Sequence, residues 1–162
     1  MKTKLIIIIT ICYILFSYFS VGYALTVGDT VPEIYGITIN DDNFILSMYN
    51  GKLRLINFFS TNCKPCEKEL PDLALLENEM PDIMIIAICV GNLNKTNVRK
   101  FIKKLSKAPK LVVCSGDFVK NDYGFHGLPH SVIIDKQGRV LKIIPGYNIK
   151  IIKKTLQKLR MP

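Results

Sequence analysis

The stretch "LRLINFFSTNCKPCEKELP" (residues 53–71) runs from an apolar segment of strand length into the start of a helix, with two cysteines at the junction. Residues 53–60 form a mainly apolar run, which is typical of a central strand covered on both faces. Residues 62–80 carry leucines and a methionine at helical spacing. The sequence therefore predicts a buried strand that leads directly into a helix, with Cys63 and Cys66 where that helix begins.

On either side of this stretch, segments with strand and helix patterns alternate along the chain. Strands are predicted at 83–90, 110–116, 131–135 and 139–146, a short helical turn at 117–125, and helices at 97–107 and 149–159. Residues 26–50 mix short apolar pieces with turn residues and indicate a small hairpin or an extended lead-in. Together these patterns predict one α/β domain over residues 25–162, with a mixed central sheet flanked by helices.

The N-terminus has the pattern of an export signal. Two lysines precede an apolar run at 5–19, and Gly22 and Ala24 are small residues at the third and first positions before a cleavage point after Ala24. The apolar stretch with its flank also approaches membrane-spanning length, so residues 1–24 are either a cleaved signal peptide or a retained membrane anchor. In both cases we expect the domain that follows to be periplasmic or otherwise extracytoplasmic.

The chain is basic, with a formal net charge of +9, which becomes +7 when residues 1–24 are left out. The simplest interpretation is a solvated surface, helped by lysines on the predicted helices. No motif with interleaved aromatic residues points to a nucleic-acid partner, so we expect none. An anionic membrane surface or an acidic protein is a more natural partner for this charge in an exported chain.

Cys63 is expected to be a reactive thiolate. A helix N-terminus offers unpaired backbone N–H groups and the positive end of the helix dipole, which favour a thiolate over a thiol. Thr61 or Asn62 is available as the N-cap, and Lys64 adds a positive charge next to the sulfur. The pKa of Cys63 should therefore lie below the value of about 8.5 for a free cysteine.

Cys66 is placed to complete the chemistry. It follows Cys63 by nearly one helical turn, close enough to attack a mixed disulfide formed there, and it should be the more buried of the two. Pro65 falls in the first turn of the helix, where its missing N–H costs no hydrogen bond. The spacing therefore favours a redox couple.

Two other interpretations of the cysteine pair are weaker. Half of a zinc site would need two more ligands, and Cys89 and Cys114 lie singly in strand-like segments without the required spacing. Two small core residues are poorly placed at a helix start between polar neighbours. We expect no metal and no cofactor, and we expect Cys89 and Cys114 to be structural, with an auxiliary disulfide between them as the alternative.

The segments "LRLINFFSTNCKPCEKELP" and "GFHGLPHSVIIDKQGRV" resemble those of the thioredoxin superfamily, and especially its exported TlpA/ResA type, which includes the cytochrome c maturation reductants. The resemblance covers roughly residues 26–160. It implies a thioredoxin fold with an N-terminal β-hairpin extension and an inserted helix and strand. It also implies a thiol-disulfide oxidoreductase in which Cys63 attacks and Cys66 resolves.

The resemblance implies roles for residues outside the cysteine pair. Pro129 corresponds to the cis-proline that faces the CxxC motif, and the backbone of Leu128 would pair with an extended substrate. Glu69 would take or return a proton during exchange, the alternative being a solvated helix glutamate. His130, next to Pro129, would titrate near working pH if it lay by the cysteines, the alternative being a surface histidine.

The chain departs from the superfamily at two points. Asn57 stands where cytoplasmic thioredoxins carry a buried aspartate, so proton handling must come from elsewhere, which gives Glu69 more importance. The tryptophans usual before the first cysteine are replaced by Phe59 and Asn62, and the chain has no tryptophan at all. Substrate contacts are therefore expected to differ.

The favoured function is reduction of protein disulfides, with apocytochrome c as candidate substrate and a membrane thiol donor as the source of electrons. Lys64 favours an oxidising couple, whereas Pro65 resembles the reducing thioredoxin pattern. A disulfide oxidase or isomerase of the same fold is one alternative. A peroxiredoxin-like peroxidase is another, since Ser60 fits its pattern although Ile56 occupies the proline position. A non-enzymatic binding module is the third.

Overall fold

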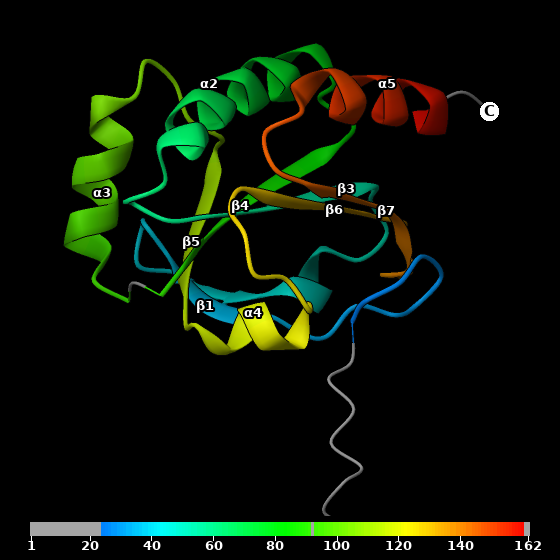
Figure 1. Cartoon of the computed structure of the whole chain (residues 1–162), viewed down its shortest axis with the longest axis horizontal. Coiled ribbons are helices and arrows are strands. Elements are labelled where there is room, and N and C mark those ends of the chain that lie inside the picture. The colour runs from blue at the N-terminus through cyan, green and yellow to red at the C-terminus, as the bar shows by residue number, and fades with distance from the viewer. Residues whose placement is uncertain (1–23, 92, 161–162) are drawn as a thin grey trace, which may run out of the picture.

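The computed structural model describes residues 24–91 and 93–160, which form a seven-stranded sheet covered by helices (Figure 1). The predicted export segment, apart from Ala24, lies outside the described residues. Within them, no helix has both the length and the apolar character needed to cross a bilayer.

The central sheet is mixed, as predicted. Its strands, in spatial order, are β2 (Asn43–Ile45), β1 (Tyr35–Thr38), β5 (Leu111–Ser115), β4 (Met84–Val90), β3 (Arg54–Phe59), β6 (His130–Ile134) and β7 (Val140–Pro145). The three strands β3, β4 and β5 run parallel, and every other neighbouring pair is antiparallel. The chain therefore enters the helix after β3 from the middle of the sheet.

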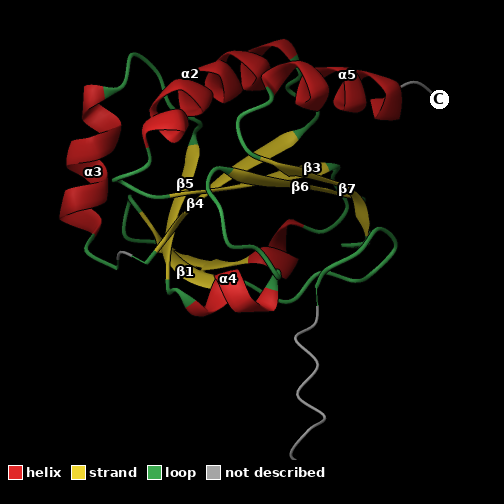
Figure 2. Cartoon of the chain, in the orientation of Figure 1, coloured by secondary structure: helices red, strands yellow, loops and turns green. Residues whose placement is uncertain are grey.

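Helices lie on both faces of the sheet (Figure 2). The elements are the 3-10 helix η1 (Leu46–Tyr49) and the α-helices α2 (Lys64–Glu79), α3 (Lys95–Lys104), α4 (Phe118–Asp122) and α5 (Ile149–Arg160). Helices α2 and α5 lie side by side above the sheet in this view, and α4 lies below it. The predicted fold class, including the N-terminal hairpin and the inserted α3 and β5, is thereby confirmed.

Both faces of β3 are buried, because its side chains alternate between two apolar layers. Leu55 packs with residues of α2 and α5, whereas Ile56 and Phe58 pack in the layer that includes α4. All six residues of β3 are buried. Each fully buried large apolar side chain contributes about 1.5–3 kcal/mol relative to an exposed one. This burial anchors the strand whose end carries the cysteine pair.

The boundaries of α3 differ from the predicted range of 97–107. The helix begins at Lys95 because the Oδ1 atom of Asn94 accepts hydrogen bonds from the N–H groups of Thr96 and Asn97. It ends at Lys104, since Leu105 is extended. An N-cap thus decided where the helix starts, and the apolar periodicity did not.

Gly36 allows β1 to lie close to β5. A Cβ atom at this position would lie 2.6 Å from both the carbonyl oxygen of Cys114 and the Cγ1 atom of Val113. These contacts are too short for any side chain. The N-terminal hairpin therefore joins the sheet through a glycine.

Candidate active site

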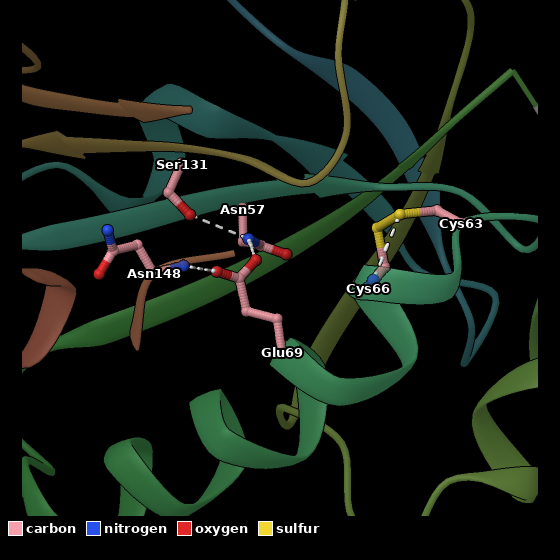
Figure 3. The surroundings of a disulfide bond; sticks show 6 residues. All are labelled: Asn57, Cys63, Cys66, Glu69, Ser131 and Asn148. Carbon is pink, nitrogen blue, oxygen red and sulfur yellow. Dashed lines mark hydrogen bonds between the residues drawn. A yellow bond between two sulfur atoms is a disulfide. The ribbon is translucent and has the colours of Figure 1, made fainter. Parts of the chain in front are cut away.

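Cys63 and Cys66 form a disulfide at the start of α2, with an S–S distance of 2.00 Å (Figure 3). Cys63 is half-buried, whereas Cys66 has no exposed surface. The expectation that Cys66 is the more buried cysteine is confirmed. A reacting disulfide from solution can therefore reach the first sulfur and is kept from the second.

Cys63 is itself the N-cap of α2. Its backbone is extended (φ −95°, ψ 103°), and its Sγ atom accepts a hydrogen bond of 3.3 Å from the N–H of Cys66. The expectation that Thr61 or Asn62 caps the helix is wrong, because the chain turns into the helix two residues later than Thr61. The N–H of Cys66 is thus shared between the carbonyl oxygen of Cys63, at 3.1 Å, and the sulfur that would carry the negative charge.

Lys64 points into solvent and pairs with an acid of its own helix. Its side chain is 85% exposed, and its Nζ atom lies 3.1 Å from Oε1 of Glu67. This pairing offsets part of the positive charge that Lys64 would present to the sulfur of Cys63. Pro65 lies in the first turn of the helix, as predicted.

A buried polar cluster lies to the left of the disulfide in Figure 3. The Nδ2 atom of Asn57 donates to Oε2 of Glu69 at 2.7 Å and to Oγ of Ser131 at 2.9 Å. The backbone N–H of Asn148, which precedes α5, donates to Oε1 of Glu69 at 3.3 Å. The carboxylate of Glu69 on α2 thus bonds to β3 and to the segment before α5, and Ser131 joins β6 to the cluster through Asn57.

Glu69 has no exposed surface, so the alternative of a solvated helix glutamate is wrong. Burial raises the pKa of Glu69, because removing the carboxylate from water disfavours its charged form. The hydrogen bonds from Asn57 and Asn148 act in the opposite direction. In Figure 3 the carboxylate faces Asn57 and Asn148 and points away from the disulfide.

The amide of Asn57 can donate to the buried carboxylate of Glu69. This amide supplies two N–H donors, and both are used, one by Glu69 and one by Ser131. An aspartate here would place two carboxylates in contact, which raises the pKa of one of them strongly. Asn57 and a buried Glu69 therefore form a compatible pair, and this accounts for the departure from cytoplasmic thioredoxins.

The peptide bond between Leu128 and Pro129 is cis. Pro129 is buried, and Leu128, like Cys63, packs against the apolar cluster that contains Cys66. Within the described residues, no hydrogen bond occupies the N–H or the C=O of Leu128. These backbone groups therefore have no hydrogen-bond partner within the described part of the chain.

His130 is buried, with 7% of its surface exposed, so the expectation of a surface histidine is wrong. Its ring stacks on Phe125 at a centroid distance of 4.6 Å. Residues alternate along a strand, and Ser131 bonds Asn57, so His130 lies on the opposite face of the sheet from that cluster. Burial lowers the pKa of His130 to about 4, which contradicts the expectation that it titrates near neutral pH.

Cys89 and Cys114 face each other on the parallel strands β4 and β5. Both are buried free thiols, so the alternative of an auxiliary disulfide is not what this structure contains. Burial raises the pKa of Cys89 to about 12. Across residues 24–91 and 93–160, no group of three or more His, Cys, Asp and Glu side chains is arranged to hold a metal ion.

Two members of the polar cluster, Ser131 and Asn148, were missed by the sequence interpretation. Ser131 is a polar residue directly before the apolar run Val132–Ile134 of β6, which is a detectable signal. Asn148 donates to Glu69 through its backbone N–H, and a backbone hydrogen bond of this kind cannot be predicted from the residue type. The arrangement as a whole can perform thiol-disulfide exchange, with a buried acid one helical turn after the second cysteine.

Comparisons with known proteins agree with this geometry. The Redoxin family model matches residues 26–159. The thiol-disulfide oxidoreductase ResA of Geobacillus thermodenitrificans is 36% identical over 132 residues, covering 80% of this chain and 75% of the relative. ResA of Bacillus subtilis is 26% identical and covers 87% of this chain and 82% of the relative.

Solved structures show the same fold. A thiol:disulfide interchange protein from Bacteroides sp. superposes with a TM-score of 0.73 at 22% identity, covering 84% of this chain and 91% of that one. A putative thiol:disulfide interchange protein DsbE from Chlorobium tepidum has a TM-score of 0.71 at 21% identity, with coverage of 83% and 95%.

Proposed function

Because the chain belongs to the Redoxin family and is a thiol-disulfide oxidoreductase of the ResA type, we propose that it uses Cys63 and Cys66 to reduce disulfides in exported proteins. The observation that carries this proposal is the asymmetry of the pair. Cys63 caps α2 and is half-buried, whereas Cys66 is fully buried behind it. One sulfur is therefore suited to attack and the other to resolve.

The reaction begins with the reduced protein. The thiolate of Cys63 attacks one sulfur of the substrate disulfide, and the other substrate sulfur leaves as a thiolate that takes up a proton. Cys66 then loses its proton and attacks the Sγ atom of Cys63, which releases the second substrate sulfur. The protein has lost two electrons and holds the Cys63–Cys66 disulfide. A thiol donor, which we propose lies in the membrane, returns two electrons before the next cycle.

The start of α2 supports the first step. The N–H of Cys66 already points at Sγ of Cys63, and the positive end of the helix dipole acts at the same atom. Both favour the thiolate, so the pKa of Cys63 should be depressed in the reduced protein. The open backbone groups of Leu128, beside the cis-Pro129, would hold the substrate in an extended conformation.

Glu69 is proposed as the base for the second step, acting through a bridging water or after its carboxylate turns from the position in Figure 3, where it points away from the disulfide. It lies one turn after Cys66 on α2, it is buried, and its raised pKa suits proton exchange better than that of an exposed carboxylate. Asn57 and Asn148 hold its carboxylate while the cysteines are oxidised and no thiol proton is present. General base assistance of this kind contributes about a hundredfold or more to a rate.

The reductive direction is favoured over an oxidase by the surroundings of Cys63. A strongly oxidising couple needs an unusually stabilised thiolate. Lys64 was the residue expected to provide this stabilisation, and its charge is offset by Glu67 at 3.1 Å. Pro65 matches the reducing thioredoxin pattern. Apocytochrome c is the proposed substrate. The chain itself is proposed to be extracytoplasmic, with residues 1–24 acting as its export signal or its membrane anchor.

Trapping partners with the Cys66→Ala variant tests this function in the compartment where the chain resides. The variant cannot resolve a mixed disulfide, so the substrate stays joined to Cys63. We expect apocytochrome c among the captured proteins and no capture by the Cys63→Ala, Cys66→Ala double variant. Capture of many unfolded exported proteins instead would indicate an oxidase or isomerase.

Two assays in vitro address the remaining alternatives. The reduced protein should reduce an insulin-type disulfide, and failure to do so would favour a non-enzymatic binding module. Peroxide consumption that survives Cys66→Ser would favour a peroxiredoxin-like peroxidase.

A further inference from the structure

A surface hollow is lined in part by the two residues that precede the attacking cysteine. It has a volume of about 420 Å³ and is lined by six residues, which we call the basic hollow: Thr61, Asn62, Asn97, Lys100, Phe101 and Lys104. Thr61 and Asn62 belong to the loop that ends at Cys63, and the other four belong to α3. Figure 1 shows α3 beside the first turn of α2.

One continuous face of α3 forms the wall of the basic hollow. Asn97, Lys100, Phe101 and Lys104 are spaced three, four and seven positions from the first, so they share one side of the helix. Phe101 has 8% of its surface exposed and packs inward, whereas the two lysines are exposed. The wall is therefore apolar at its base and cationic at its rim.

The positive charge of this face is not neutralised. Helix α3 carries five cationic residues and no acidic one. Lys95 and Arg99 both pair with Asp41, whereas Lys100 and Lys104 join no ion pair within the described residues. The residues that line the basic hollow include no carboxylate. Two unpaired ammonium groups and two side-chain amides thus surround a space that suits a carboxylate.

The position of the basic hollow identifies its occupant. A substrate joined to Cys63 through a disulfide must place the residues next to its own cysteine close to Asn62. An extended chain advances about 3.3–3.6 Å per residue, so the hollow lies within a few residues of the bond. A membrane surface forms no disulfide with Cys63, so nothing in the reaction would bring it to this hollow.

From this geometry we infer that the basic hollow selects substrates with an acidic residue close to the disulfide, whose carboxylate binds Lys100 and Lys104. This specificity rests on the proposed disulfide reduction. It adds a charge preference to a reaction that the cysteine pair would otherwise perform on any accessible disulfide. Opposite charges also raise the rate of encounter, and this effect is weakened by salt.

Two peptides test the inference directly. Each contains one intramolecular disulfide, and they differ only in a glutamate or a glutamine two residues from one cysteine. The reduced full-length chain is mixed with each peptide, quenched with acid and alkylated, and peptide thiols are quantified by mass. We expect the second-order rate constant to be about three- to tenfold higher for the glutamate peptide at low salt, and the ratio to approach one in high salt.

Matched variants locate the effect. Lys100→Gln with Lys104→Gln should reduce the ratio of the two rate constants to near one. Lys103→Gln with Lys107→Gln removes the same charge from neighbouring positions outside the hollow and should leave the ratio at its wild-type value. The pH dependence of Cys63 alkylation by iodoacetamide, measured in both variants, shows whether the lysines act on the cysteine instead of on the substrate.

The outcomes separate this inference from the proposed function. If neither peptide is reduced, both proposals fail. If both peptides are reduced at equal rates, the function stands and the charge preference is refuted. The preference is also refuted if Lys100→Gln with Lys104→Gln slows the reduction of both peptides by the same factor. It is likewise refuted if this variant binds vesicles of phosphatidylglycerol more weakly while the ratio of the two peptide rate constants stays at its wild-type value.

Discussion

The side-chain amide of Asn57 donates a 2.7 Å hydrogen bond to the carboxylate of Glu69, and neither residue has exposed surface. This contact joins the central strand β3 to the helix that carries the cysteines. At the position where cytoplasmic thioredoxins carry a buried aspartate, this chain has the hydrogen-bond donor Asn57, and its buried acid is Glu69 on α2. The ionisable group thus stays near the cysteine pair while its position in the chain changes.

Asn57→Asp should destabilise the protein, and more so as the pH rises. Two carboxylates would then lie in contact without water, and ionising both is unfavourable. We expect the free energy of unfolding in urea to fall by about 3 kcal/mol or more at pH 8, and by less at pH 5. Adding Glu69→Gln should restore much of the loss, because the glutamine amide can donate to the introduced carboxylate. Strictly additive effects of the two substitutions would contradict the contact.

Glu69→Gln should make the stability of the oxidised protein less dependent on pH. The pKa of Glu69 is raised in the folded state, so the folded protein keeps this proton to higher pH than the unfolded chain does. Its contribution to stability is complete below the unfolded pKa of about 4.3 and is lost as the pH rises through the folded pKa. Urea unfolding from pH 4 to pH 8 should therefore show a smaller decline for the variant, and parallel curves would argue against the raised pKa.

Gly36→Ala should weaken the attachment of the N-terminal hairpin. The new Cβ atom would lie 2.6 Å from the carbonyl oxygen of Cys114, which cannot move without disturbing β5. We expect a loss of about 1–3 kcal/mol in the free energy of unfolding. Gly127→Ala is the control, because a Cβ atom there meets nothing within 4 Å. Equal stability of the two variants would show that β1 is not held closely against β5.

Alkylation of the reduced, folded protein with iodoacetamide at pH 7.5 should modify Cys63 first. Cys89 and Cys114 are buried, and burial raises the pKa of Cys89 to about 12, so it holds almost no thiolate at this pH. Peptide mapping by mass should find both thiols unmodified until urea is added. In the Cys63→Ser variant the fast phase should disappear. Labelling of Cys89 as fast as Cys63 in the folded protein would overturn this assignment.

Local patterns in the sequence were sufficient for the order of elements and for the reactive pair. The apolar run before Cys63 predicted β3, and the leucine spacing after it predicted α2, because both patterns arise from the periodicity of a single segment. The CxxC spacing places both sulfurs on the first turn of one helix, so this part of the site needs no distant residue. The resemblance to the superfamily added the cis-proline.

The surroundings of the pair were decided by tertiary structure alone. Glu69 is buried because α2 and β3 pack together. Asn148 donates to its carboxylate and Ser131 accepts from Asn57, each from a segment more than 70 positions away from its partner. His130 lies inside because its side of β6 faces an aromatic cluster. Periodicity reports which face of one segment is apolar. It does not report which segments are stacked on that face, and that stacking determines which polar groups lose water and which donors they find.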